Sequence, residues 1–264
     1  MFPEELCTHL SSLHANAPAH SWEITKTTVE DALGIAPGTL FEVFESFDPK
    51  PLASGSIAQV HKAVLNPDTH QAKEFWPTEQ QHQYQSPIIS IQQSSSLQPT
   101  NQPTPKGTDI AVKVRHPMVA ELIDWDFRIL LRLADIVDSI PALKWLNVRS
   151  SVEQFSHTMA AQAHLDVEAH HLEVLNYNFR RWKTVGFPRP FYATNSIICE
   201  TFEKGNVVTN IIDQYDDEAM LLGRQGHQLI PIDLAQFLVT NGLSVYLKML
   251  LVDNLMHADL HPGV

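Results

Sequence analysis

Short runs predict strands in four parts of the chain, and in two of them apolar and polar positions alternate. The runs SIAQVHKAVL, at residues 56–65, and DIAVKVRH, at residues 109–116, alternate as half-buried strands do. Two shorter strand-like runs, FPRPFY and SIICETFE, stand on either side of Thr194 and Asn195. The run TLFEVFESF, at residues 39–47, suits either a strand or a short helix. We expect the first two runs to pair as an antiparallel hairpin.

Helical periodicity accounts for most of the remaining chain. Residues 3–34 predict two short amphipathic helices. An apolar stripe from residue 119 predicts a long helix that Pro141 ends. A second helix is predicted over residues 150–182, where the opening SSVE resembles a capping box. A third begins near Pro231 and carries a broad aliphatic stripe, which predicts a core helix leading into the C-terminal loop.

The segment between the first two predicted strands has a different composition. Residues 66–107 are rich in Gln, Ser, Pro and Thr and contain few charged side chains. Such a composition buries too little apolar surface to offset the entropy of ordering. We therefore expect a disordered loop inserted into the hairpin.

Bulk composition limits the classes of function. A length of 264 residues suits one large domain or two small ones, and a net charge of −12 excludes a global basic surface for nucleic acid. Cys7 and Cys199 are too few and too distant for a disulfide framework or a zinc ribbon, which favours a reducing compartment. No apolar run has the length of a transmembrane helix, and the acidic start MFPEEL resembles neither a secretory signal nor a transit peptide. Either the protein is cytosolic or its true N-terminus precedes Met1.

A lysine within an apolar strand is the first candidate for chemistry. The run IAVKV surrounds Lys113 with the residues of a buried sheet. One interpretation is an edge strand whose lysine points to water. The other is a lysine that reaches the α- and β-phosphates of a nucleotide and is held there by a helix glutamate. The preceding PLASGSIAQV supplies a small-residue turn whose N–H groups suit phosphates, although Gly55 alone is no GxGxxG loop.

The C-terminal run HADLHPGV is the second candidate. A protein-kinase catalytic loop carries an Asp, and then an Asn five residues later. Asp259 suits the first role, in which the carboxylate accepts the proton of an attacking hydroxyl. In a competing interpretation His257 and His261 hold a metal ion, but the Pro-Gly that follows indicates a loop, and Ala258 replaces the Glu of a HExxH motif. We therefore favour the catalytic-loop interpretation and predict no metal site.

Five segments in order resemble one known family. PLASGSIAQVHKA, IAVKVRHP, LDVEAHHLEVLNYNF, FPRPFY with IICETFEKG, and VDNLMHADLHPG are similar to the UbiB/aarF family of atypical kinase-like proteins, in particular its mitochondrial branch. The resemblance implies an α+β, protein-kinase-like fold with a complete small lobe and a truncated large lobe. It places an N-terminal helical extension at residues 1–36, the small lobe at 37–204 with the insert at 66–107, and the start of the large lobe, ending in the catalytic loop, at 205–264.

The same resemblance implies roles for individual residues. Ala53, Ser54, Gly55 and Ser56 are implied to form the nucleotide loop, Lys113 to bind phosphate, Glu168 to hold Lys113, Glu200 and Phe202 to meet adenine, and Asp259 to be the catalytic aspartate. We therefore predict an ion pair between Lys113 and Glu168. The family's HPGN motif ends in Asn where Val264 stands here, and its Lys-x-Gly-Gln helix and Asp-Phe-Gly segment are not in the sequence. The chain thus resembles a product truncated at both ends, which we expect to be inactive in phosphoryl transfer.

The function implied for the parent protein is ATP binding with Mg²⁺, followed by phosphoryl transfer or ATP hydrolysis. The family is tied to coenzyme Q and lipid metabolism, which implies a mitochondrial location with inner-membrane lipids or coenzyme Q biosynthesis proteins as partners, and no nucleic acid. An alternative is a nucleotide- or lipid-binding pseudokinase scaffold that transfers no phosphoryl group. A third possibility is an interaction module without a nucleotide site.

Overall fold

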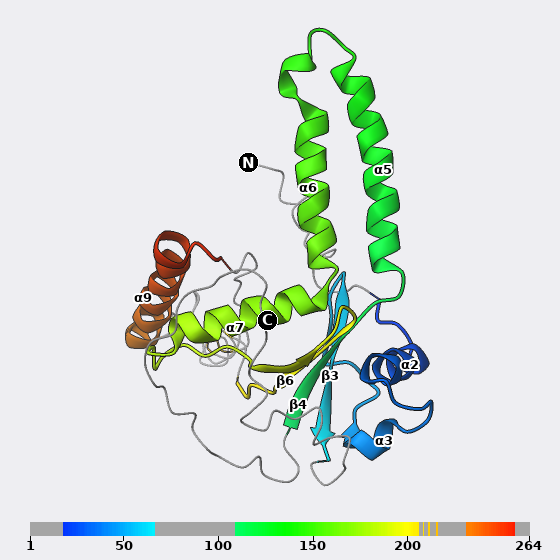
Figure 1. The fold of residues 1–264 in the computed structure, drawn as a ribbon. Coiled ribbons are helices and arrows are strands. Elements are labelled where there is room, and N and C mark those ends of the chain that lie inside the picture. Colours follow the sequence, from blue (N-terminus) through cyan, green and yellow to red (C-terminus); the bar gives the residue numbers. More distant parts are fainter. Residues whose placement is uncertain are drawn as a thin grey trace, which may run out of the picture. The chain divides into compact units, whose positions relative to one another are not determined.

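The computed structural model describes residues 18–66, 109–205 and 231–256, together with Val208, Ile211 and Tyr215 (Figure 1). The first of the two predicted N-terminal helices, the insert beyond Asn66 and the loop that contains Asp259 lie outside these residues.

The chain divides into two compact units. The first consists of Met1–Leu172 and Arg189–Phe202, and the second of Glu173–Pro188 and Glu203–Val264. Helix α7, Leu165–Phe179, contributes residues to both units.

The first unit is built on an antiparallel sheet of six strands in the order β1-β3-β4-β6-β5, with β2 also beside β3. The strands are β1 Phe44–Phe47, β2 Ala53–Ser54, β3 Ala58–Leu65, β4 Asp109–Arg115, β5 Pro190–Ala193 and β6 Ile197–Thr201. The predicted hairpin is confirmed, since β3 and β4 pair continuously from Ala58 opposite Arg115 to Val64 opposite Asp109. Because β4 has a neighbour on both sides, the interpretation of IAVKV as an edge strand is wrong.

Two helices cover one face of this sheet. They are α2, Trp22–Leu33, and the short α3, Leu40–Val43, which runs directly into β1. The run at residues 39–47 is therefore both a helix and a strand. The buried core between helices and sheet contains Val29, Leu33, Leu40, Val43, Phe44, Phe47, Ala63, Leu65, Ile110, Val112, Val114, Ile197 and Cys199. Each large aliphatic side chain buried in this way contributes about 1.5–3 kcal/mol to folding.

A buried carboxylate fixes the turn between α2 and α3. Helix α2 ends at Leu33 and is followed by Gly34, whose φ of 66° is the left-handed conformation that glycine adopts most readily. Beyond it, the N–H groups of Gly38 and Leu40 donate to Oε1 of Glu30 at 2.9 and 3.2 Å. Glu30 is only 4% exposed, so these bonds replace the water that its carboxylate would otherwise bind.

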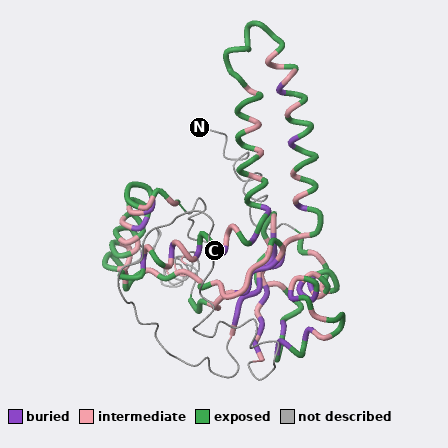
Figure 2. The backbone as a smooth tube through the Cα atoms, in the orientation of Figure 1, coloured by how far each residue is buried: buried purple, intermediate pink, exposed green. Residues whose placement is uncertain are grey.

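A helical hairpin is inserted between β4 and α7. It consists of α5, Val119–Asp138, and α6, Val148–Gln162, joined by a short 3₁₀ turn at Lys144–Leu146. The two helices lie side by side (Figure 1), and most of their residues are exposed (Figure 2). Helix α5 confirms the first predicted long helix.

The single helix predicted over residues 150–182 is wrong. It is broken between α6 and α7, and α6 begins after Asn147 rather than at a capping box on Ser150. At the break, Arg115 Nη1 donates to the carbonyl of Ala163 at 2.9 Å, and the N–H of Leu165 donates to the carbonyl of Asn195. These tertiary bonds satisfy backbone groups that a continuous helix would have used itself.

The second unit packs the end of α7 against α9, Ile232–Lys248, which continues as a π-helical turn, Met249–Asp253. The buried cluster comprises Leu175, Phe179, Val245 and Met249. Lys248 Nζ lies 4.3 Å from the centroid of the Phe179 ring and 2.7 Å from Oδ1 of Asp253.

Helix α9 begins directly after Pro231, as predicted, but its aliphatic stripe is less buried than a core helix requires. Leu243, Leu247 and Leu251 are exposed in the described residues. By length and composition alone, Ile232–Asp253 is the one described helix that meets the criterion for crossing a membrane, whereas no such helix was expected from the sequence. The core helix of a soluble protein meets the same criterion.

Replacing the insert is expected to leave the stability of the first unit nearly unchanged. Val64 and Asp109 are directly opposite one another, so a short Gly-containing turn in place of residues 66–107 closes the same hairpin. Loop-closure entropy changes only slowly with length, and we expect Tm to move by less than about 3 °C in thermal unfolding followed by circular dichroism. A much larger fall would show that the insert packs on the sheet.

Candidate functional site

The register of the sheet places Lys113 in one row with the predicted nucleotide loop. Ala53 is opposite Val60, Val60 is opposite Lys113, and Lys113 is opposite Ile198. Directly opposed residues of antiparallel strands point to the same face of a sheet. Because Val112 and Val114 face the core under α2, this row lies on the other face.

Helix α7 brings a carboxylate to Lys113 on that face. Leu165 and Ala169 of α7 pack against Ala58 and Ile198 of the sheet. Between them along the helix, Glu168 accepts hydrogen bonds from Lys113 Nζ at 2.7 Å through both Oε1 and Oε2. The predicted ion pair is therefore confirmed.

Partial solvent exposure limits what this ion pair contributes to stability. The Lys113 side chain is 25% exposed and that of Glu168 is 42% exposed. Ion pairs at such exposure contribute about 0–1 kcal/mol. The pair is consequently more effective in orienting the ammonium group than in holding the fold together.

The predicted loop at residues 53–56 comprises strand β2 and the first two residues of the tight turn that leads into β3. The N–H of Gly55 donates to the carbonyl of Ala58, and the N–H of His116 donates to the carbonyl of Ile57, both at 2.9 Å. Ala53, Gly55 and Ser56 are exposed. The turn therefore keeps a defined shape while its own surface stays open to solvent.

The two predicted hinge residues differ in their surroundings. Glu200 is opposite Ala111 and so shares the face of the sheet with Lys113. The ring of Phe202 lies 5.3 Å from Nζ of Lys62, which also pairs with Asp109 at 3.1 Å. Lys62 is a second cation on this face that the motifs did not identify, although the alternation of β3 places it there.

The described part of the chain thus gathers the predicted loop, Lys113, Glu168 and Glu200 on one face of one sheet. It holds no group of three or more His, Cys, Asp or Glu side chains suited to a metal ion. The catalytic role of Asp259 stays a prediction, because this residue lies outside the described ranges.

Cys199 lies on the opposite face of the same strand as Glu200 and is an inert thiol. It is 2% exposed within the core under α2. Burial, with a smaller contribution from the negative charge of Glu200, raises the pKa of Cys199 to about 12. The reactive thiolate form is therefore almost absent near neutral pH.

Alkylation tests this assignment. We expect iodoacetamide to modify Cys199 at least about 100-fold more slowly in the folded chain than in denaturant, because only the thiolate reacts. Mass spectrometry of the peptide that contains Cys199, sampled over time, measures both rates. Equal rates in the two conditions would mean that β6 opens readily or that the thiol is exposed.

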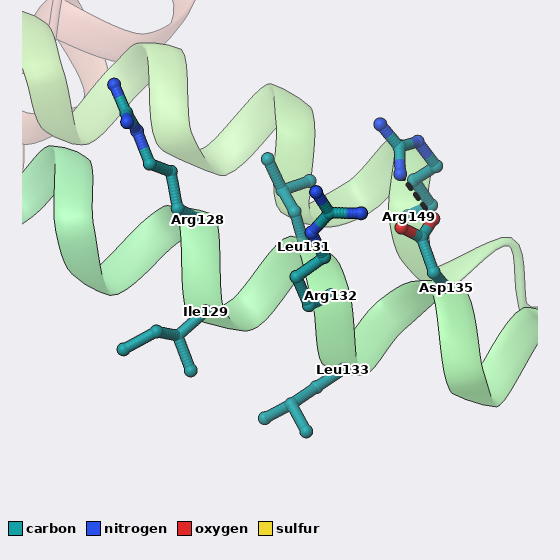
Figure 3. A pocket seen from close by; sticks show the side chains of 7 residues that line it. All are labelled: Arg128, Ile129, Leu131, Arg132, Leu133, Asp135 and Arg149. Atoms are coloured by element: carbon teal, nitrogen blue, oxygen red, sulfur yellow. Dashed lines mark hydrogen bonds and ion pairs between the residues drawn. The ribbon is translucent and has the colours of Figure 1, made fainter.

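A hollow lies along the α5–α6 hairpin, away from the predicted site residues (Figure 3). It has a volume of about 590 Å³ and is lined by Arg128, Ile129, Leu131, Arg132, Leu133, Asp135 and Arg149. Arg149 of α6 reaches Asp135 of α5, whose hydrogen bond and charge raise the pKa of this guanidinium. The hollow contains none of the predicted site residues.

Comparison with known proteins gives consistent relatives. A family model described as the ABC1 atypical kinase-like domain matches residues 12–72 and 101–264, leaving out most of the polar insert. A probable serine/threonine-protein kinase, abkC, of Dictyostelium discoideum is 32% identical over 100% of this chain and 30% of its own length. A mitochondrial ABC1 family protein of Schizosaccharomyces pombe is 31% identical over 100% of this chain and 34% of its own. A probable protein kinase UbiB of Aliivibrio fischeri is 26% identical over 100% and 39%.

A solved structure supports the fold. The complex of Rv3197 with erythromycin from Mycobacterium tuberculosis matches with a TM-score of 0.55 at 18% identity, over 99% of this chain and 52% of that one. The chain spans about a third of the length of the curated relatives it matches. The mixed helices and antiparallel sheet confirm the predicted α+β, kinase-like class. The chain therefore belongs to the UbiB/aarF family of ABC1 atypical kinase-like proteins.

Proposed function

We propose that the first unit binds ATP, with Lys113 on the α- and β-phosphates. The carrying observation is the contact of Lys113 Nζ with both oxygens of Glu168, on the central strand of the sheet. A lysine held in this way presents a compact cation in a fixed direction, which suits phosphate oxygens. Ala53 of β2 stands in the same row, and the exposed turn that follows it would supply backbone N–H groups to the phosphates.

The remaining contacts of the nucleotide are assigned by position in the sheet. Glu200 and Phe202, where β6 ends, are proposed to meet adenine. The donor set of Lys113 and backbone amides fits the phosphates of a nucleotide. No carboxylate cluster for Mg²⁺ exists among the described residues, so Mg²⁺ enters the proposal only as the counterion that ATP carries.

For the whole protein, we propose phosphoryl transfer or ATP hydrolysis with Asp259 as the catalytic base, in mitochondrial coenzyme Q or lipid metabolism. The names of the relatives support this proposal, since two are called probable protein kinases and one is called mitochondrial. A scaffold that binds nucleotide or lipid without turnover is the alternative. Inner-membrane lipids or coenzyme Q biosynthesis proteins are the proposed partners.

Thermal shift with a series of nucleotides tests the proposal on the full 264-residue chain. At a ligand concentration about 100 times Kd, binding stabilises the folded state by about 2.7 kcal/mol, which raises Tm by several degrees. We expect Mg–ATP and Mg–ADP to produce this rise, and AMP, which lacks the β-phosphate, to produce much less. A parallel assay of phosphate release separates turnover from binding alone.

Each result has one meaning. Stabilisation by ATP and ADP with phosphate release supports the kinase or ATPase assignment. Stabilisation without release supports the nucleotide site alone, because this chain is expected to be inactive in phosphoryl transfer. Equal stabilisation by AMP would contradict the role of Lys113 at the phosphates. No stabilisation by any nucleotide at millimolar concentration would overturn the nucleotide site itself.

A further inference from the structure

A run of hydrogen-bonded side chains crosses the first unit and ends at the nucleotide loop. In order it consists of the carbonyl of Asp48, His61, Gln59, Thr25, His20, His116 and the carbonyl of Gly55. Its side chains come from β3, from α2 and the residue before its N-cap, and from the residue that follows β4. None of these side chains has a part in the proposed function above.

The Gly55 end determines which ring nitrogens carry hydrogen. His116 Nε2 lies 2.9 Å from the carbonyl oxygen of Gly55, and a carbonyl only accepts, so Nε2 carries the hydrogen. In the neutral ring Nδ1 is then bare, and it accepts from Nδ1–H of His20 at 2.7 Å. His20 Nε2 in turn accepts from the hydroxyl of Thr25 at 3.0 Å.

The hydrogen positions can be assigned in the same way from the Asp48 end of the run. His61 Nδ1 donates to the carbonyl of Asp48 at 2.8 Å, so its bare Nε2 accepts from Gln59 Nε2 at 2.9 Å. The second hydrogen on Gln59 Nε2 points to Thr25 Oγ1 at 3.0 Å, and Gln59 Oε1 accepts the N–H of His20. In this arrangement each bond of the run joins one donor to one acceptor, while Thr25 Oγ1 also lies 3.5 Å from the carbonyl of Ser21 and Gln59 Nε2 lies 3.4 Å from that of His20.

The surroundings lower the pKa values of two of these rings, His20 and His61. Burial, followed by the charges of His116 and His61, lowers the pKa of His20 to about 4. Burial also lowers the pKa of His61, against the hydrogen bond and charge of Asp48, which act to raise it. The groups that act on these two rings are the imidazoles themselves and Asp48. The pKa of His20 is lower in the folded than in the unfolded chain. The contribution of neutral His20 to folding stability is therefore complete above about pH 6.5 and is lost as the pH falls towards 4.

We infer that His116 is a positioning residue for the nucleotide site: by holding the carbonyl of Gly55, it fixes the peptide that joins Gly55 to Ser56. A trans peptide is planar, so its N–H points opposite to its oxygen. Holding the oxygen at His116 therefore fixes the direction of the Ser56 N–H and keeps the partial negative charge of the carbonyl from turning towards phosphate. His20 acts one step further away by orienting the ring of His116. This inference rests on the proposed nucleotide site.

Two conservative variants of His116 separate positioning from folding. In His116→Gln the amide nitrogen occupies the place of Nε2 and keeps a donor for Gly55. In His116→Asn the amide group reaches only the place of Nδ1, so it keeps a partner for His20 and loses the bond to Gly55. The exposed His157 on α6 gives a matched control, His157→Ala.

The expected result is a split between affinity and stability. We expect His116→Gln to bind Mg–ATP within about 3-fold of the unaltered chain and His116→Asn to bind about 5- to 10-fold more weakly, the effect of one lost hydrogen bond. Tm should fall by a similar amount in both variants, because each loses one contact of the ring. His157→Ala should change neither quantity.

Isotope-labelled imidazoles test the run without nucleotide. Long-range nitrogen–proton correlation spectra should show hydrogen on Nε2 of His116 and on Nδ1 of His20 and His61. Other tautomers would overturn the inference, and so would equal affinities of the Asn and Gln variants in a chain that binds Mg–ATP. Failure of the unaltered chain to bind Mg–ATP would instead overturn the proposed function, and the positioning role with it.

Discussion

Replacing Lys113 by methionine is expected to weaken the binding of Mg–ATP by about 10- to 100-fold. A hydrogen bond between a charged donor and phosphate contributes about 1.5–3 kcal/mol, and methionine keeps the apolar stem while removing the charge. The free energy of unfolding should hardly change, because both side chains of the ion pair with Glu168 are partly exposed. Titration calorimetry measures Kd, and thermal unfolding measures Tm on the same preparation.

Two further variants make the result specific. Lys144→Met removes an exposed lysine at the turn of the hairpin and should leave Kd unchanged. Glu168→Gln keeps Lys113 but weakens its orientation, so we expect a smaller loss of about 3- to 10-fold. Full affinity in Lys113→Met would remove the lysine from the site, and a Tm loss of more than about 10 °C would show that the pair is mainly structural.

The second large effect concerns Glu30. Glu30→Ala is expected to lower the free energy of unfolding by about 2–4 kcal/mol, because the N–H groups of Gly38 and Leu40 lose a charged acceptor that is itself buried. For a unit of this size the loss corresponds to a fall in Tm of about 5–15 °C. Chemical and thermal unfolding followed by far-ultraviolet circular dichroism measure both quantities.

Two other replacements of glutamates on α2 separate the loss of the buried hydrogen bonds from the loss of a negative charge on this helix. Glu30→Gln keeps an oxygen acceptor and should cost less than about 1.5 kcal/mol. Glu23→Ala removes an exposed glutamate from the same helix and should cost less than about 1 kcal/mol. If Glu30→Ala costs no more than Glu23→Ala, the turn before α3 has other supports.

The sequence pattern predicted those helices and strands whose bounds depend on neighbouring residues alone. The alternation in SIAQVHKAVL and DIAVKVRH predicted β3 and β4, and Pro231 predicted the start of α9. The break between α6 and α7 was missed because its cause is tertiary: Arg115 and Asn195 satisfy the backbone there. The central position of β4 was left open for a similar reason, since its second neighbour, β6, is distant in the sequence.

The candidate site also contains contacts that motifs predict and contacts that they do not. Resemblance to a family predicted the contact of Lys113 with Glu168, because both residues stand in recognisable motifs. The histidine run was missed, although His61 and His116 stand inside the quoted motifs VHKA and VRHP. Their partners His20 and Thr25 belong to a third segment, and a hydrogen bond between side chains of separate segments leaves no periodic signal.

The central strand also has a consequence for the rate of folding. Both partners of β4 are distant in the sequence: Val64 pairs with Asp109 across the polar insert, and Val114 pairs with Ile197 across the helical hairpin and α7. Loop entropy grows only logarithmically, so these separations cost little at equilibrium. They slow folding much more, because the entropy of closing these loops is lost before the strand contacts that offset it have formed. Until β6 arrives, β4 presents an unpaired apolar edge to solvent, and aggregation of that transient state competes with folding. Shortening the insert should therefore raise the refolding yield at high protein concentration even if Tm is unchanged.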